Sequence, residues 1–141
     1  MLDFSVSWLP LLVVALVNFI LSWLYYSPVV PWFAAWQRGV GVDPAKKEMT
    51  AEEKAAMPRL FGGAIVATFL LPIGLAFLVH NLRVMDFVGG LQVGVVVWAA
   101  FSVSHSLNTQ FEGRKPVVLV INNVLNLIVY AAAAGLFAVW R

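Results

Sequence analysis

The chain has 141 residues, of which 62% are hydrophobic and only 11% are charged. Soluble domains carry roughly 25% charged residues, so this composition excludes an ordinary soluble fold. The chain has nine Lys and Arg against seven Asp and Glu. This small excess does not indicate nucleic-acid binding, because the basic residues do not cluster on a soluble surface. Cysteine is absent, which excludes disulfides, a thiolate nucleophile and sulfur-ligated metal sites.

Four apolar runs are long enough to cross a bilayer, which takes about 20 helical residues. They cover residues 7–26, 60–80, 87–109 and 117–140, and none contains Asp, Glu, Lys or Arg. A helix of a soluble bundle would show a charged and polar face toward water, and these runs contain no charged residue. We therefore expect a single all-α membrane domain over residues 1–141, with four transmembrane helices in an antiparallel bundle.

The first run is expected to be a retained transmembrane helix and not a secretory signal. Asp3 is the only charged side chain at its amino end, where a signal peptide carries basic residues. The run ends in Tyr25, Tyr26, Ser27 and Pro28 without a small-residue cleavage pattern.

The loop over residues 27–59 is expected to have structure of its own. Trp32, Phe33 and Trp36 lie within about one helical turn, so segment 31–38 is predicted to form a short helix in the membrane interface.

A second helix is predicted later in this loop. Asp43-Pro44 can start a helix, and Thr50 with Glu53 has the spacing of a capping box. We expect a cytoplasmic surface helix over residues 44–57.

Small residues and one proline stand out within the later spans. Pro72 in the second span is expected to kink its helix, because proline removes a backbone hydrogen bond. Gly90 and Gly94 in the third span, and Ala131 and Gly135 in the fourth, permit close helix approach within the chain.

Loop charges predict the orientation. Basic residues gather in loops 27–59 and 110–116, with seven there against two on the other side: Arg38, Lys46, Lys47, Lys54, Arg59, Arg114 and Lys115 against Arg83 and Arg141. The positive-inside rule places both loops in the cytoplasm and both termini outside. The bacterial inner membrane is the expected location.

Polar side chains share one face on three of the spans, each set within an arc of about 100°. These sets are Asn18, Ser22, Tyr25 and Tyr26; Ser102, His105, Ser106 and Thr109, with Asn108 at the margin; and Asn122, Asn123, Asn126 and Tyr130. Because polar groups are expensive in hydrocarbon unless they meet partners, we expect the three faces to turn toward one another in the cytoplasmic half.

Two interpretations of these faces stay open. Mutual hydrogen bonding alone would satisfy them, which makes them structural. Alternatively, they line a polar pocket open to the cytoplasm, and its candidate ligand-binding residues are Asn18, Ser22, Tyr25, Tyr26, Ser102, His105, Asn108, Arg114, Asn122 and Asn126.

Catalytic and metal-binding sites have little support in the sequence. His105 has only Glu112 nearby, and a metal site needs three or four ligands. His80 is expected at the opposite membrane face. No nucleophile-elbow motif surrounds any serine, and no carboxylate lies within a span to carry protons for an antiporter. We predict no catalytic residue, metal or cofactor.

The sequence resembles the bacterial membrane family DUF1761, a domain of unknown function. The resemblance lies in Asn18, the motif Tyr25-Tyr26-Ser27-Pro28, Trp36, the motif Phe111-Glu112-Gly113-Arg114, and Ile121-Asn122, in order along the chain. It implies a four-helix integral membrane protein and brings no assigned activity.

The leading hypothesis is a homo-oligomeric membrane protein that binds a small amphiphile, such as a lipid, a quinone or a hydrophobic metabolite. In that hypothesis Arg114 neutralises an anionic head group. The alternatives are a transporter or channel subunit that works as an oligomer, and a structural accessory subunit of a larger membrane complex. An enzyme has the least support.

Overall fold

The computed structural model describes residues 2–46 and 48–140, and over those residues it contains helices and no strands. In chain order the elements are α1 (Trp8–Tyr25), α2 (Phe33–Gly39), α3 (Ala51–Asn81), α4 (Phe87–Val97), the π-helical η1 (Trp98–Val103), α5 (Ser104–Asn108), the 3-10 helix η2 (Thr109–Glu112) and α6 (Pro116–Val139). Lys47 and Arg141, which contributed to the loop charges, lie outside the described residues.

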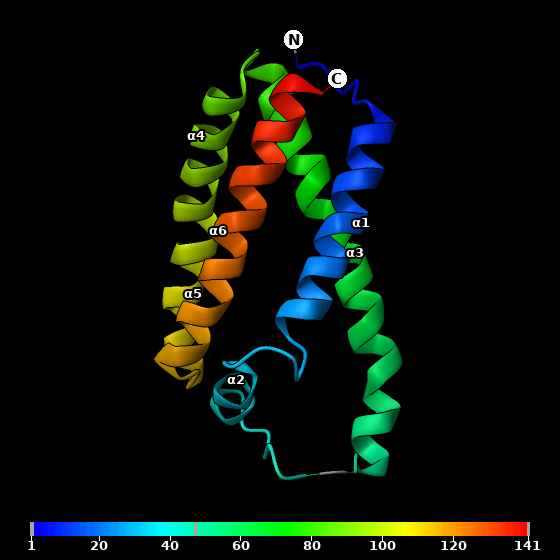
Figure 1. The fold of residues 1–141 in the computed structure, drawn as a ribbon, viewed down its shortest axis with the longest axis vertical. Helices are drawn as coiled ribbons and strands as arrows, with labels where there is room; N and C mark the ends of the chain where they lie inside the picture. The colour runs from blue at the N-terminus through cyan, green and yellow to red at the C-terminus, as the bar shows by residue number, and fades with distance from the viewer. Residues whose placement is uncertain (1, 47, 141) are drawn as a thin grey trace.

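Four helical stretches are long and apolar enough to cross a membrane: α1, α3, the run Phe87–Glu112 and α6. Figure 1 shows that the chain runs in alternating directions through these stretches, that α1 covers only the part nearest the termini while α3 continues to the opposite end, and that both termini lie at one end. Helix α2 lies at the other end, near the start of α6. Helix α6 is central, because it contacts α1, α2, α3, α4, η1 and α5.

The buried core lies in the half of the molecule nearest the termini. There the start of α1, the end of α3 and the end of α6 meet through buried apolar side chains: Leu11, Val14, Leu75, Ala76, Val79, Ala133, Ala134, Phe137 and Ala138. The other half of α3 is largely exposed. Its apolar side chains are therefore available to lipid.

The closest helix contact joins α4 to α6. A Cβ added to Gly90 would lie 2.5 Å from the Ala134 carbonyl oxygen, and one added to Gly94 would lie 2.6 Å from Ala131 Cα. Only glycine allows the two backbones to approach this far. The predicted close approach of these glycines to Ala131 and Gly135 within one chain is confirmed.

The separate surface helix predicted over residues 44–57 is wrong. Helix α3 begins at Ala51 and continues without interruption to Asn81. The Asp43 carboxylate accepts a hydrogen bond from the Ala45 amide, which folds this stretch into a local turn. The predicted capping box between Thr50 and Glu53 is confirmed, and it sets the start of the helix.

Helix α3 remains helical through Pro58 and Pro72. Its 31 residues span roughly 46 Å at 1.5 Å per residue, more than the ~30 Å of hydrocarbon in a bilayer. Glu52, Glu53 and Lys54 occupy its first turn. A single helix can thus contain both the charged segment and the second span.

Candidate functional site

A cavity of about 350 Å³ opens between the third apolar run and α6. We call it the α5–α6 cavity. Its lining comes from the two sides of the chain's last hairpin: Phe101, Ser102, His105, Ser106 and Thr109 on one side, and Arg114, Leu119, Asn122, Asn126 and Tyr130 on the other. Five of the ten predicted site residues lie here: Ser102, His105, Arg114, Asn122 and Asn126.

The turn that closes this hairpin explains why the two sides face each other. Gly113 adopts a left-handed conformation with φ of 79°, which glycine tolerates without steric cost. Pro116 then occupies the first turn of α6, where its missing N–H costs nothing. Arg114 lies between them at the mouth of the cavity and is exposed.

The wall of the cavity is fixed by hydrogen bonds that start in the π-helical segment η1. The Ser102 hydroxyl donates to Asn123 Oδ1 over 2.9 Å and accepts from Asn126 Nδ2 over 2.8 Å. The Trp98 indole N–H donates to the Asn123 carbonyl oxygen over 2.9 Å. These bonds join η1 to the middle of α6, and Ser102 is buried at the joint.

Tyrosines at the end of α1 connect this helix to the same region. The Tyr25 hydroxyl donates to the Ile121 carbonyl oxygen over 2.9 Å, and the Tyr26 hydroxyl donates to Asn122 Oδ1 over 2.8 Å. Because Asn122 also lines the cavity, Tyr26 contacts the cavity wall from behind.

Helix α2 packs on these tyrosines. The rings of Tyr26 and Trp36 have centroids 5.0 Å apart, and those of Tyr25 and Trp32 are 4.8 Å apart. The Trp32 indole N–H also donates to the Tyr25 carbonyl oxygen over 3.0 Å. The motif Tyr25-Tyr26-Ser27-Pro28 thus ends α1, anchors α2 and reaches α6.

Three predicted site residues lie elsewhere. Asn18 and Ser22 bond to each other, the Ser22 hydroxyl donating to Asn18 Oδ1 over 3.4 Å. Asn18 lines a smaller apolar groove of about 80 Å³ between α1 and α6. Asn108 is exposed and outside the cavity lining. Tyr26, the residue that follows α1, is the contact between this part of the chain and the cavity wall that the described residues show, through its hydrogen bond to Asn122.

Two indoles in this region were absent from the predicted site. Trp98 and Trp32 both donate to backbone carbonyls, and their place near helix ends or in an apolar run gave no sign of it. Asn123 belonged to the predicted polar face of the last span and was omitted from the site, although it is the centre of the hydrogen-bond network.

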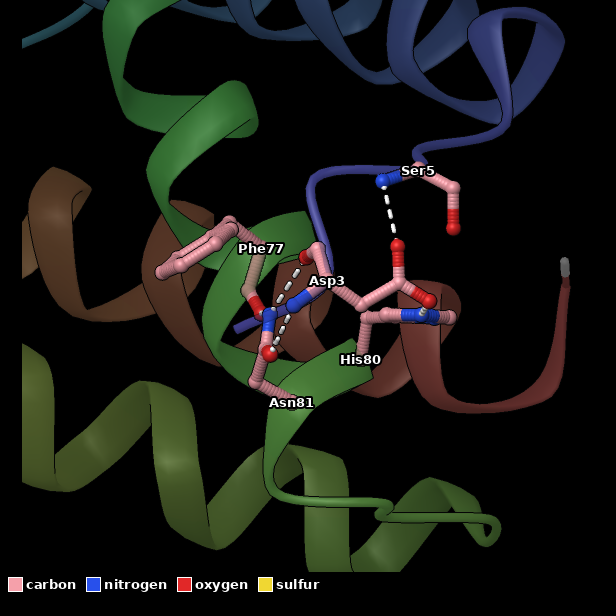
Figure 2. Close-up of polar contacts among 5 residues, drawn as sticks. All are labelled: Asp3, Ser5, Phe77, His80 and Asn81. Atoms are coloured by element: carbon pink, nitrogen blue, oxygen red, sulfur yellow. Dashed lines mark hydrogen bonds and ion pairs between the residues drawn. The ribbon is translucent and has the colours of Figure 1, made fainter. Parts of the chain in front are cut away.

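A second polar cluster lies at the end of the molecule that holds the termini, as Figure 2 shows. The His80 imidazole N–H donates to Asp3 Oδ2 over 3.0 Å. Asn81 exchanges two 2.8 Å hydrogen bonds with the Asp3 backbone. The hydrogen bond from His80, helped by the Ser5 amide, lowers the pKa of the Asp3 carboxyl below its ordinary value. This cluster ties the amino-terminal segment to α3.

Metal binding finds no support in residues 2–46 and 48–140, where no three His, Cys, Asp or Glu side chains lie close enough to hold an ion. His80 belongs to the cluster at the termini and His105 to the α5–α6 cavity.

A family model described as a protein of unknown function, DUF1761, matches residues 9–139, nearly the whole chain. The chain belongs to the DUF1761 family. No curated protein and no solved structure matches it. In this DUF1761 protein, the two motifs that carried the resemblance lie at the site: the tyrosines of the first contact α6, and Arg114 of the second lines the cavity.

Proposed function

We propose that this DUF1761 protein is an integral protein of the bacterial cytoplasmic membrane, with its four long helices in an antiparallel transmembrane bundle. The alternating course of the helices in Figure 1 supports this arrangement. The excess of basic residues in loops 27–59 and 110–116 favours the cytoplasmic side for the α2 end and the outer side for both termini.

The protein's function, in this proposal, is to bind a small amphiphile in the α5–α6 cavity. One observation carries the proposal: an open cavity of about 350 Å³ lies between two helices apolar enough to span a membrane, yet its wall includes hydroxyl, amide and imidazole groups. Ligand sites combine apolar walls with a few placed polar groups in this way. Arg114 at the mouth supplies a permanent positive charge for an anionic head group.

Helix α2 is well placed to cover the entrance from the membrane interface. Its Trp36 contacts the ring of Tyr26 at a tilted angle, and the Tyr26 hydroxyl in turn donates to Asn122 of the cavity wall. Trp32, Phe33 and Trp36 give it the aromatic face that interfacial helices use.

Lipid retention during purification tests the proposal. The protein is extracted in mild detergent, and its bound lipids are measured by native mass spectrometry. The double variant Asn122→Leu with Asn126→Leu should lose the retained amphiphile. Asn108→Leu, on the exposed face outside the cavity, should keep it. Equal retention in both variants would count against the proposed site.

The oligomeric state, the transporter or channel alternative and the accessory-subunit alternative stay predictions. Flux through reconstituted vesicles tests the second, and cross-linking to a constant partner in native membranes tests the third.

A further inference from the structure

The hydrogen bonds behind the α5–α6 cavity have a fixed direction. The Leu119 backbone carbonyl can only accept, and it accepts from Asn123 Nδ2 over 2.9 Å. The Asn123 amide is thereby oriented with Oδ1 toward η1, where it accepts a hydrogen bond from the Ser102 hydroxyl. With its one proton donated, Ser102 must accept from Asn126, and it does so from Nδ2.

The consequence for the cavity lies at Asn126. Because its Nδ2 is held by Ser102, its Oδ1 is left as the acceptor, and none of the described residues donates to it. Asn126 is half-buried and lines the cavity, where its Oδ1 remains accessible. A ligand that covers this oxygen without donating to it would leave a buried carbonyl without a partner, which is costly, so the position favours a ligand that brings an O–H or N–H group.

Asn122 presents the opposite chemistry. Its Oδ1 accepts from the Tyr26 hydroxyl, so its NH2 group is the part available to a ligand. Asn122 lies one helical turn closer to the mouth than Asn126, or roughly 6 Å along α6. Arg114 lies closer still, in the turn before α6.

In order along the chain from the turn into α6, the cavity lining therefore offers a cation at Arg114, a hydrogen-bond donor at Asn122 and a hydrogen-bond acceptor at Asn126. Beyond them the rings of Tyr130 and Phe101 add apolar surface, with Phe101 on the exposed rim. No Asp or Glu is among the lining residues. A ligand that fits carries three parts in order: an anionic group, a hydrogen-bond donor, and an apolar chain.

On the basis of the proposed function, we infer that the α5–α6 cavity selects a single-chain anionic lipid with a free hydroxyl between the anionic group and the chain. A lysophospholipid with a free glycerol hydroxyl has this order of groups. Amine head groups place their donor beyond the phosphate, on the wrong side of Arg114. A quinone carries carbonyl acceptors alone and leaves Asn126 Oδ1 without a donor.

Two matched probes test the selection on the wild-type protein. One is 1-oleoyl lysophosphatidic acid, and the other is the same molecule with hydrogen in place of the free hydroxyl. Their affinities are measured in detergent by tryptophan fluorescence, with the lipid-depleted protein. The hydroxylated probe should bind roughly three- to tenfold more tightly, which is the net value of one hydrogen bond. Glycerol 3-phosphate, which lacks the chain, should not compete.

A variant then tests the direction of the hydrogen bonds. Ser102→Ala removes the partner that holds Asn126 Nδ2, so Oδ1 is no longer fixed toward the ligand and the ratio of the two affinities should fall. Ser104→Ala, on an exposed neighbour outside the lining, should leave the ratio unchanged. Because the ratio is measured within one protein, a lower overall affinity does not imitate the effect.

The outcomes separate the two proposals. Equal affinity of the two probes for the wild-type protein overturns the hydroxyl selection and leaves amphiphile binding intact. Failure of both probes to bind overturns the assignment to a single-chain anionic lipid, while amphiphile binding itself is decided separately by the lipid-retention experiment. Competition by glycerol 3-phosphate at equal strength shows a site for a free anion and overturns the requirement for a lipid chain.

Discussion

Tyr26 and Tyr130 show how differently two hydroxyls on apolar helices can be used. The Tyr26 hydroxyl donates to Asn122 across a helix interface. The Tyr130 hydroxyl forms no hydrogen bond with the described residues, although the ring lines the same cavity. At residue scale, the contribution of a polar group to the free energy of unfolding depends on whether that group has a hydrogen-bond partner, and not only on whether it lies within a span.

Removing each hydroxyl tests that distinction. Tyr26→Phe keeps the tilted ring contact with Trp36 and loses the hydrogen bond to Asn122, so the free energy of unfolding should fall by about 0.6–1.5 kcal/mol. Tyr130→Phe should change it by less than about 0.5 kcal/mol. Reversible unfolding in mixed micelles of mild detergent and dodecyl sulfate measures both. A larger loss for Tyr130→Phe would contradict the assignment.

Asp3 gives the protein a pH dependence at its amino-terminal segment. Since hydrogen bonds in the folded state lower the pKa of its carboxyl below the ordinary 3.8, its contribution to stability is present above that pH. The contribution is lost as the pH falls through the lowered pKa. The segment should therefore detach from α3 only in strong acid.

A spin label at position 2 measures this detachment. The sequence has no cysteine, so Leu2→Cys gives a single labelled site on an exposed residue. The label should stay immobile at about pH 4 and gain mobility only as the pH falls further, and the same label in Asp3→Asn should lose this pH dependence. A wild-type label that is already mobile above about pH 4, or an acid response that is unchanged in Asp3→Asn, would contradict the role of Asp3.

At the scale of elements, the packing of α4 on α6 depends on two glycines, and Gly94 is the more demanding. A side chain there meets the backbone of α6 at Tyr130 and Ala131, which cannot move aside as a flexible side chain could. Gly94→Ala should destabilise the protein by about 1–3 kcal/mol, the usual cost of overpacking.

Gly74→Ala is the matched control for this helix contact. A Cβ at Gly74 of α3 would have no heavy atom within 4 Å. Alanine also favours a helix over glycine by up to about 1 kcal/mol, so this change should be neutral or stabilising. Unfolding in mixed micelles should show a lower free energy of unfolding for Gly94→Ala than for the wild type, and an equal or higher one for Gly74→Ala. Equal effects of the two changes would show that α4 and α6 are not in close contact.

The elements also show what the sequence could and could not predict. The apolar runs ended within about a residue of α1 and α6, because Pro28 and Pro116 are unambiguous signals. The start of α3 was misplaced because two helix-starting patterns compete before it. A pattern alone does not reveal that Asp43 bonds to Ala45 in a turn, while Thr50 and Glu53 cap the helix reciprocally.

The π-helical segment η1 lies beyond what periodicity predicts. A constant 100° per residue assumes α-helix throughout, and a π turn adds a residue and shifts the faces that follow. Ser102 and His105 nevertheless lie opposite Asn122 and Asn126 of α6, as the faces were predicted to meet, and Asn108, predicted at the margin of its face, lies outside the cavity lining. Asn18 was misjudged for another reason, since depth in the membrane does not fix which neighbour a helix face meets.

At the scale of the whole molecule, the proposed orientation can be read by chemical labelling. Single cysteines at Ser5, Ala45 and Gln110 lie on exposed loops or ends. In intact cells a membrane-impermeant maleimide should label Ser5→Cys, which lies at the end with both termini. Ala45→Cys and Gln110→Cys should react only after permeabilisation. The reverse pattern would invert the topology and place Arg114 outside.

The two ends of the molecule are packed with different kinds of side chain. Aliphatic side chains of three helices interlock where the termini meet, and such cores resist compression. Toward α2, aromatic rings join α1 to α2, and the buried Val118 of α6 lies against Gly39. A ligand in the α5–α6 cavity would therefore lie at the aromatic end of the molecule, and its binding would leave the aliphatic core in place.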